Sequence, residues 1–164
     1  MFDGVIWTVA GIVAGSRLAA TLDERREILH RSDASHEAVM TPRDPGGLST
    51  ALRATLATRI AVRNADPRLA DHYRAMLEAD TGRTPELLRL ASPEEAPTGD
   101  AWLVAVVRHA DLLTMAPQDS GAPEVEALRA AGVVDADIVR LTQLVGFLSY
   151  QVRLAAALRL LQDT

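Results

Sequence analysis

The chain has 164 residues, which is enough for one domain with a sizeable hydrophobic core. Hydrophobic residues make up 48% and aromatic residues only 4%, so the core must be mainly aliphatic, as in closely packed helices. The net charge is −5, and the 17 basic residues, all arginines, are scattered among carboxylates, which argues against a nucleic-acid-binding protein. The absence of cysteine excludes disulfides, thiolate metal sites and thiol catalysis.

Residues 1–40 are expected to form an N-terminal helical arm. Residues 5–14 are apolar and predict a short helix, but Asp3 precedes them and Arg17 follows, so they lack the basic flank of a signal peptide. They are also too few to cross a bilayer. We therefore expect a cytoplasmic protein with no membrane segment. Ser16 predicts the cap of a second segment, and a third, highly charged helix follows it.

The core is expected to span residues 48–162, after a loop rich in Pro and Gly. Ser49 predicts the cap of a helix that runs to about Arg63. The pairs Asp66-Pro67 and Thr84-Pro85 combine an N-cap with proline at the first helical position, so they predict the starts of the next two helices. Gly82 is the expected end of the first of these two helices.

The C-terminal half is predicted to be helical as well. Residues 102–115 are strongly apolar with helical spacing, and a short helix before Gly132 follows a turn. Residues 132–161 predict one long amphipathic helix. Strict alternation of apolar and polar residues is absent throughout, so the sequence predicts a single all-α domain over residues 1–164.

The final helix carries a run of aromatic and polar residues that ends in arginine: Phe147, Ser149, Tyr150, Gln151 and Arg153. This run resembles the closing helix of the carboxymuconolactone decarboxylase/alkylhydroperoxidase-D superfamily. Two further blocks resemble the same superfamily, namely HADLLTMAPQDSGAPEVEALRAAG and ALRATLATRIAVRNADPRLADHYRAML. The resemblance implies an alkylhydroperoxidase-D-like helical bundle with a long C-terminal helix.

The sequence differs from the peroxidases of that superfamily in lacking their cysteine pair. Their Cys-x-x-Cys-x-x-x-His motif opens the second core helix, where the helix N-terminus lowers the thiol pKa and the second cysteine resolves the oxidised first. Here the two cysteine positions fall on Asp66 and Leu69, the histidine position falls on Tyr73, and His72 lies one residue earlier. A glutamate of the family falls near Ala54. The resemblance therefore indicates a cysteine-less branch without thiol peroxidase chemistry.

Four residues are candidates for a catalytic site, and each has a simpler structural interpretation. Asp66 is either a helix N-cap or a base in the former thiol pocket. His72 is either a proton-transfer group or a half-buried helix residue. Tyr73 either presents its hydroxyl to a pocket or packs at the edge of the core. Arg153 either grips a carboxylate or carbonyl of a ligand, or pins helix packing. No metal or cofactor is expected, because the histidines lack metal-ligand spacing.

Two functions stay open. The first is an enzyme that transfers protons on a small organic acid or lactone through His72, Tyr73 and Arg153. The second is a non-catalytic helical homo-oligomer, or a partner subunit of an active relative. The final helix favours self-association, because apolar residues such as Val139 and Leu160 lie off its main apolar face and need neighbours of their own.

Overall fold

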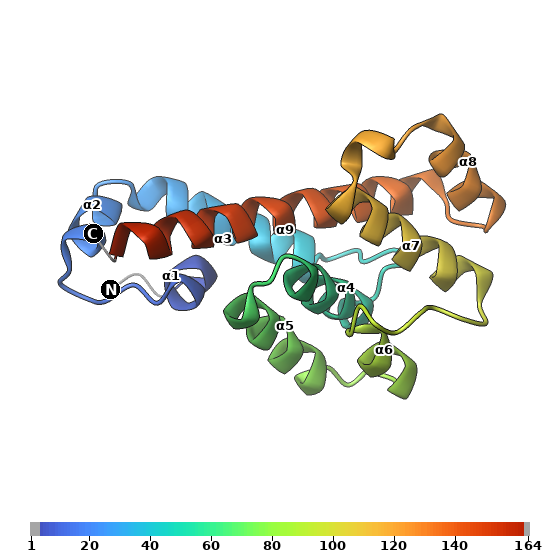
Figure 1. The fold of residues 1–164 in the computed structure, drawn as a ribbon, viewed down its shortest axis with the longest axis horizontal. Helices are drawn as coiled ribbons and strands as arrows, with labels where there is room; N and C mark the ends of the chain where they lie inside the picture. Colours follow the sequence, from blue (N-terminus) through green and yellow to red (C-terminus); the bar gives the residue numbers. More distant parts are fainter. Residues whose placement is uncertain (1–3, 163–164) are drawn as a thin grey trace.

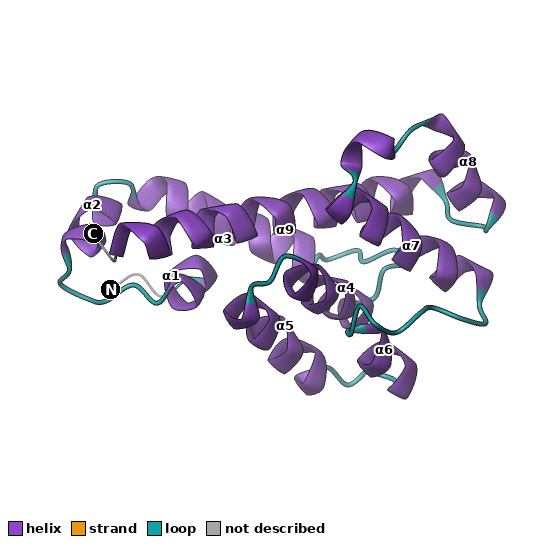
Figure 2. Cartoon of the chain, viewed as in Figure 1, coloured by secondary structure: helices purple, strands orange, loops and turns teal. Residues whose placement is uncertain are grey.

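The computed structural model describes residues 4–162, which form helices and turns without any strand (Figure 2). The predicted all-α class is confirmed. Residues 1–3, the start of the expected N-terminal arm, lie outside the described part, as do residues 163–164. A short 3₁₀ turn, Pro117–Asp119, follows α7. The α-helices are α1 (Val5–Ala10), α2 (Arg17–Asp23), α3 (Arg26–Met40), α4 (Thr50–Arg63), α5 (Pro67–Ala79), α6 (Pro85–Leu90), α7 (Ala101–Met115), α8 (Ala122–Ala130) and α9 (Asp135–Gln162).

The long helix α9 forms the axis of the molecule (Figure 1). Helices α1, α3, α4, α7 and α8 all contact it. Helix α1 lies near its C-terminal end and α8 near its N-terminal end, so elements from both ends of the sequence share one rod (Figure 1). One continuous apolar cluster runs from Ile6 of α1 to Leu158 of α9. The predicted long C-terminal helix is confirmed.

Helix starts follow the local capping signals of the sequence. Ser16, Ser49, Asp66 and Thr84 each accept a hydrogen bond from the backbone N–H three residues later, at 3.0 to 3.2 Å. The predicted end of α5 at Gly82 is wrong: the helix stops at Ala79. Asp80 has an extended backbone, and its carboxylate accepts the N–H of Gly82 at 2.7 Å, which forms a turn before the glycine is reached.

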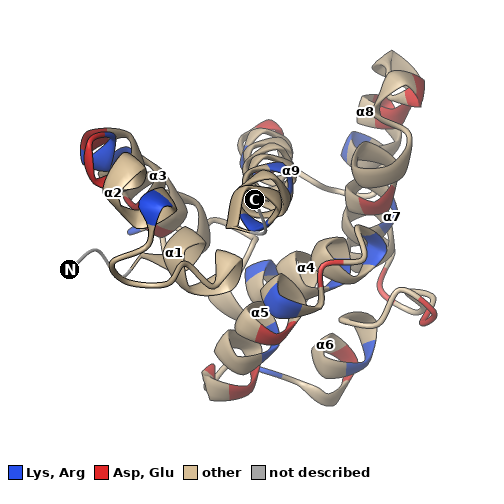
Figure 3. Cartoon of the chain, turned by 60° about the vertical axis from the view of Figure 1, so that its left-hand side comes forward, with Lys and Arg blue, Asp and Glu red and all other residues tan. Residues whose placement is uncertain are grey.

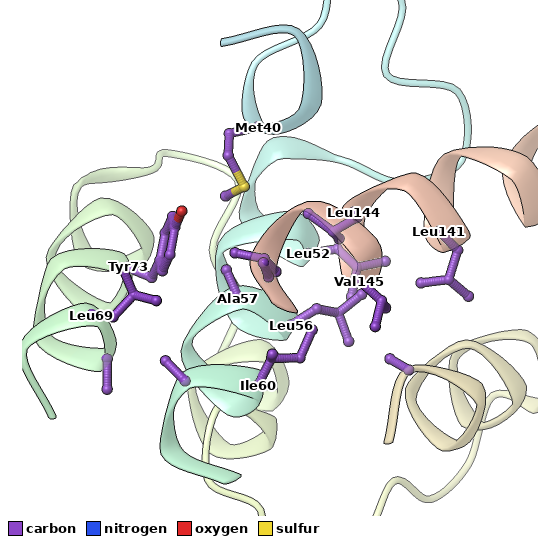
Figure 4. Close-up of a cluster of buried hydrophobic side chains, with 14 of the residues drawn as sticks. Met40, Leu52, Leu56, Ala57, Ile60, Leu69, Tyr73, Leu141, Leu144 and Val145 are labelled. Atoms are coloured by element: carbon purple, nitrogen blue, oxygen red, sulfur yellow. The ribbon is translucent and has the colours of Figure 1, made fainter. Parts of the chain in front are cut away.

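Helix α4 is buried on all sides, since every residue from 51 to 61 is buried. It lies between α5 and α9 (Figure 1). Figure 4 shows the apolar side chains that it shares with these neighbours and with the end of α3: Met40, Leu52, Leu56, Ala57, Ile60, Leu69, Tyr73, Leu141, Leu144 and Val145. Burying large aliphatic side chains contributes about 1.5–3 kcal/mol each, so this contact region supplies much of the folding free energy.

Two arginines of α4, Arg53 and Arg59, are also buried. In each of them every guanidinium nitrogen has a hydrogen-bond acceptor. Arg53 donates to three backbone carbonyls, those of Val39 (2.8 Å), Pro45 (3.0 Å) and Leu48 (2.8 Å). These carbonyls belong to the end of α3 and to the loop that leads into α4. A buried guanidinium is tolerated only when its donors find acceptors, so Arg53 fixes the path of this loop.

Arg59 does the same for the loop after α6. It pairs with both carboxylate oxygens of Asp111 on α7 at 2.8 Å, and it donates to the carbonyls of Leu90, Ser92 and Glu95. Arg63 binds the same carboxylate at 2.7 Å. Burial would raise the pKa of Asp111, but hydrogen bonds from the two guanidinium groups outweigh burial and lower it.

Charges on the outside are interspersed. Figure 3 shows acidic and basic residues on most helices. Several are exposed pairs within one helix turn, such as Arg31 with Glu27 and Arg129 with Glu126. Pairs of this kind contribute little to stability, so the surface is a solvated helical one.

Helix α9 has a second property that follows from its composition. Within residues 4–162 it is the one helix that is long and apolar enough to cross a membrane. In this fold 39% of its most apolar 18-residue stretch is buried. Core helices of soluble proteins pass the same test, so length and composition are weak evidence for a membrane span.

The Arg59 network yields the first prediction. Arg59→Met should lower the free energy of unfolding by about 3–5 kcal/mol, because it leaves buried acceptors without their donor. The matched exposed change Arg31→Met should cost less than about 1 kcal/mol. Urea denaturation measures both, and equal losses would contradict the assigned role of Arg59.

Candidate functional site

Asp66, directly before α5, is fully engaged in the fold. It caps α5 by accepting the N–H of Leu69 at 3.1 Å. Nη2 of Arg159 on α9 binds both of its carboxylate oxygens, at 2.8 and 2.9 Å. The Asp66 side chain is only 3% exposed. A buried carboxylate held in this way stabilises a helix junction and is not available as a free base.

Two turns further along α5, Tyr73 makes a second connection to α9. Its ring is fully buried, and its hydroxyl donates a short hydrogen bond to Oε1 of Gln151, which is also buried. Burial raises the pKa of Tyr73 well above its ordinary value. The pairs Asp66–Arg159 and Tyr73–Gln151 thus hold α5 against α9 at two levels.

The fold brings a residue of the arm, His36 of α3, to this connection. The His36 ring lies nearly parallel to that of Tyr73, with 6.0 Å between centroids. His72 is 6.1 Å from His36 and 5.0 Å from Tyr73 by the same measure, and Phe147 of α9 lies 6.1 Å from His36. His36, His72, Tyr73 and Gln151, from three helices, are called the histidine cluster below.

Two polar atoms at the cluster have no partner in the described protein. They are Nε2 of His36 and Oγ of Ser32, both buried. Ser32 and His36 lie one turn apart on α3, and Ser32 is only 7% exposed. Buried polar groups in folded proteins nearly always form hydrogen bonds, so these two atoms, on residues one turn apart, stand out as unsatisfied groups within residues 4–162.

Burial sets the protonation of the cluster. It lowers the pKa of His36 from 6.5 to about 4, and the nearby His72 adds to this effect. Burial lowers the pKa of His72 as well. Both imidazoles are therefore neutral at neutral pH. Each neutral imidazole has one nitrogen with a lone pair that can accept a proton. The proton acceptors of the histidine cluster are therefore its two histidines, since none of its four members is a carboxylate.

The structure gathers only part of the predicted site. His72 and Tyr73 lie together, and Asp66 lies two turns before Tyr73, engaged as a cap and ion pair. Arg153 does not join them: it is exposed, and its Nη1 lies 3.4 Å from its acceptor, the carbonyl of Ser149. Arg153 follows the inward-facing Gln151 by two residues, about 200° around the helix, so it lies on the outer side of α9, and a ligand-facing role for it stays a prediction.

His36, Ser32 and Arg159 were not among the site residues predicted from the sequence. A signal for the first two was present, because Ser32, His36 and the buried Met40 recur at four-residue spacing and share one face of α3. For Arg159 the signal is weaker, since its partner Asp66 lies on another helix. Within residues 4–162, no group of three or more His, Cys, Asp or Glu side chains is placed to hold a metal ion.

Comparison with known proteins supports the fold. This chain is similar in structure to an uncharacterized peroxidase-related protein from Silicibacter sp. TM1040, with a TM-score of 0.70 and 22% sequence identity. The similarity covers 80% of this chain and 68% of the other. No family model matches the sequence, and no curated protein matches it. The predicted all-α bundle with a long C-terminal helix is confirmed, and at this identity the likeness shows the fold alone.

The histidine cluster predicts a pH dependence of stability. His36 of the unfolded chain becomes protonated below about pH 6.5. In the folded chain the same residue stays neutral until about pH 4. Stability is therefore complete above this window and falls as the pH decreases through it. When the pH falls from about 7 to 5, the free energy of unfolding of His36→Leu should decrease by about 1 kcal/mol less than that of the wild type. This difference is reduced because His36 is partly exposed to solvent.

Urea denaturation at several pH values measures this difference. Ser35→Leu is the control, because it adds an apolar residue to the exposed side of the same helix and removes no titratable group. It should keep the pH dependence of the wild type. A His36→Leu variant with that same pH dependence would show that His36 is not buried as a neutral ring.

Proposed function

We propose that this chain is a non-thiol enzyme on an alkylhydroperoxidase-D-like fold that transfers a proton on a small organic acid or lactone. The observation that carries the proposal is the buried Nε2 of His36, which has no partner within residues 4–162, with the equally unpartnered Oγ of Ser32 one turn earlier on α3. His36 is assigned as the general base. Its low pKa, caused mainly by burial, keeps it unprotonated well into the acid range.

The proposed step balances without any further reactant. The lone pair of Nε2 of His36 takes a proton from the carbon next to the substrate carbonyl, and the electrons of that C–H bond form the enolate. In an unsaturated lactone this enolate is conjugated with the C=C bond. The imidazolium returns the proton to the far carbon of that conjugated enolate, so the C=C bond shifts and the net reaction is an isomerisation. The low polarity that disfavours the imidazolium makes this return favourable.

The other members of the cluster have positioning roles. Tyr73 lies nearly parallel to the imidazole of His36 and is itself fixed by Gln151. His72 borders the same ring and supplies a second neutral imidazole. A base held by packing on two sides needs little reorganisation before the reaction, which lowers the entropic part of the barrier.

Hydrogen–deuterium exchange next to the carbonyl of unsaturated γ-lactones, followed by NMR in D₂O, tests this proposal. The protein should accelerate the exchange over buffer, and His36→Leu should slow it by about a hundredfold or more. The rate should persist down to about pH 5, where a histidine base of ordinary pKa has lost most of its activity.

The exposed change Arg83→Gln serves as the control and should leave the exchange rate unchanged. Exchange at the buffer rate with the wild type, or an unchanged rate in His36→Leu, would refute the proposed base. A rate that falls with an apparent pKa near 6.5 would also contradict it, because the base would then be an exposed histidine.

We further propose that the chain self-associates through the outer face of α9. Seven exposed residues follow one another there at alternating spacings of four and three: Val139, Gln143, Gly146, Tyr150, Arg153, Ala157 and Leu160. This is the spacing of a helix-pairing seam, and a single charge lies in it. Tyr150 is 41% exposed and Leu160 is 70% exposed.

Gly146 supports this second proposal independently. It lies in the middle of α9, where glycine costs about 1 kcal/mol relative to alanine. A Cβ atom built on it would meet nothing within 4 Å. The fold itself therefore does not require glycine, whereas the close approach of a second helix would. An antiparallel pair of α9 helices would also keep the two Arg153 side chains apart.

Light scattering at micromolar concentration tests the seam. The wild type should give a mass well above the 17.6 kDa of one chain. Gly146→Glu, which adds bulk and charge to the seam, should weaken association by at least about tenfold, equivalent to 1.4 kcal/mol. Ala34→Glu on the exposed side of α3 should not. A wild-type monomer, or equal masses for the two variants, would overturn the proposal.

A further inference from the structure

A large cleft opens at the C-terminal end of α9, apart from the residues of the histidine cluster. Its volume is about 940 Å³. The segment after α1, the helix α2 and the first residues of α5 form its other walls (Figure 1). Within residues 4–162 it is lined by three arginines, Arg17, Arg68 and Arg159, and by no acidic side chain. We refer to it as the arginine cleft.

At the base of the arginine cleft, the end of α9 is hydrogen-bonded to the end of α1 and the residues after it. Gln162 donates to the carbonyl of Ala10 at 2.8 Å and accepts the N–H of Val13 at 3.3 Å. Arg159 donates to the carbonyl of Val9 at 3.2 Å and to buried Asp66. The charge of Arg159 is thus balanced by Asp66. The hydrogen bonds between α9 and the end of α1 shape this part of the cleft without any ligand.

The other two arginines are not balanced. In the part of the chain that the structure describes, neither Arg17 nor Arg68 forms an ion pair, and the one hydrogen bond of the Arg68 side chain is a long contact of 3.5 Å with the carbonyl of Ala10. Both side chains are largely exposed. Among the described residues, these two guanidinium groups line one concave surface without a carboxylate, an arrangement that favours an anion in an otherwise acidic protein.

The remaining wall of the arginine cleft is apolar. Val13, Leu18 and Leu161 line it, and Val13 is 65% exposed. Ser16 and Thr21 add hydroxyl groups. A concave site with an aliphatic wall and a few convergent charged groups suits a ligand with one anionic end and one aliphatic part. Guanidinium groups bind carboxylates through paired hydrogen bonds, which a single ammonium group does not match.

We propose that the arginine cleft binds an aliphatic monocarboxylate, with the carboxylate held by Arg17 and Arg68 and the chain lying against Val13, Leu18 and Leu161. This site is independent of proton transfer at the histidine cluster, because it shares no residue with that cluster. Arg159 and Gln162 keep their structural roles and do not bind the ligand.

Isothermal titration calorimetry with octanoate tests the proposal on the full chain. Octanoate should bind, and the double variant Arg17→Gln, Arg68→Gln should weaken binding by at least about tenfold, equivalent to 1.4 kcal/mol. The control Arg43→Gln removes an exposed arginine outside the cleft and should leave the affinity unchanged. His36→Leu should also bind octanoate like the wild type, which separates this proposal from the one on proton transfer.

Two reference ligands make the outcome decisive. Inorganic phosphate has the charge without the aliphatic chain, and octylamine has the chain with the opposite charge. Both should bind at least about tenfold more weakly than octanoate. Absence of octanoate binding at millimolar concentration would overturn the proposal. Equal binding of phosphate or octylamine, or an unchanged affinity in the double variant with a native circular dichroism spectrum, would do the same.

Discussion

Complete burial of α4 is the constraint on which the rest of the structure depends. A helix with neighbours on every side leaves no water for its polar side chains, so each of them needs a hydrogen-bond partner within the protein, and its two buried arginines find theirs in other elements. Arg53 takes carbonyls from the chain before α4, and Arg59 takes Asp111 and the carbonyls after α6. Loops without regular structure are thereby fixed around α4, and both α5 and α9 pack against it.

Helices α5 and α9 are joined at two levels. At the start of α5, Asp66 is bound by Arg159, and Leu69 is buried. Further along α5, the rings of His72 and Tyr73 lie beside that of His36 from the arm. The arm therefore contributes directly to the candidate site.

Local sequence signals predicted the elements well, and tertiary contacts explain where prediction failed. Ser49, Asp66 and Thr84 act on their own backbone three residues away, so their capping is readable from the sequence. The neighbours of His36 come from α5 and α9, which no local pattern reveals. Arg153 was grouped with Gln151 because the two are close in sequence, yet helical geometry turns one outward and the other inward. The seam on α9 and the arginine cleft likewise depend on the folded arrangement.

His36 is a half-buried, neutral imidazole, and within residues 4–162 its buried Nε2 has no hydrogen-bond partner. An NMR titration of the histidine ring nitrogens, assigned with a His36→Gln variant, tests this claim most directly. The account predicts that the His36 signals titrate at about pH 4, far below the ordinary value of 6.5. Titration of His36 near 6.5 would place the ring in water and contradict both the cluster and the function built on it.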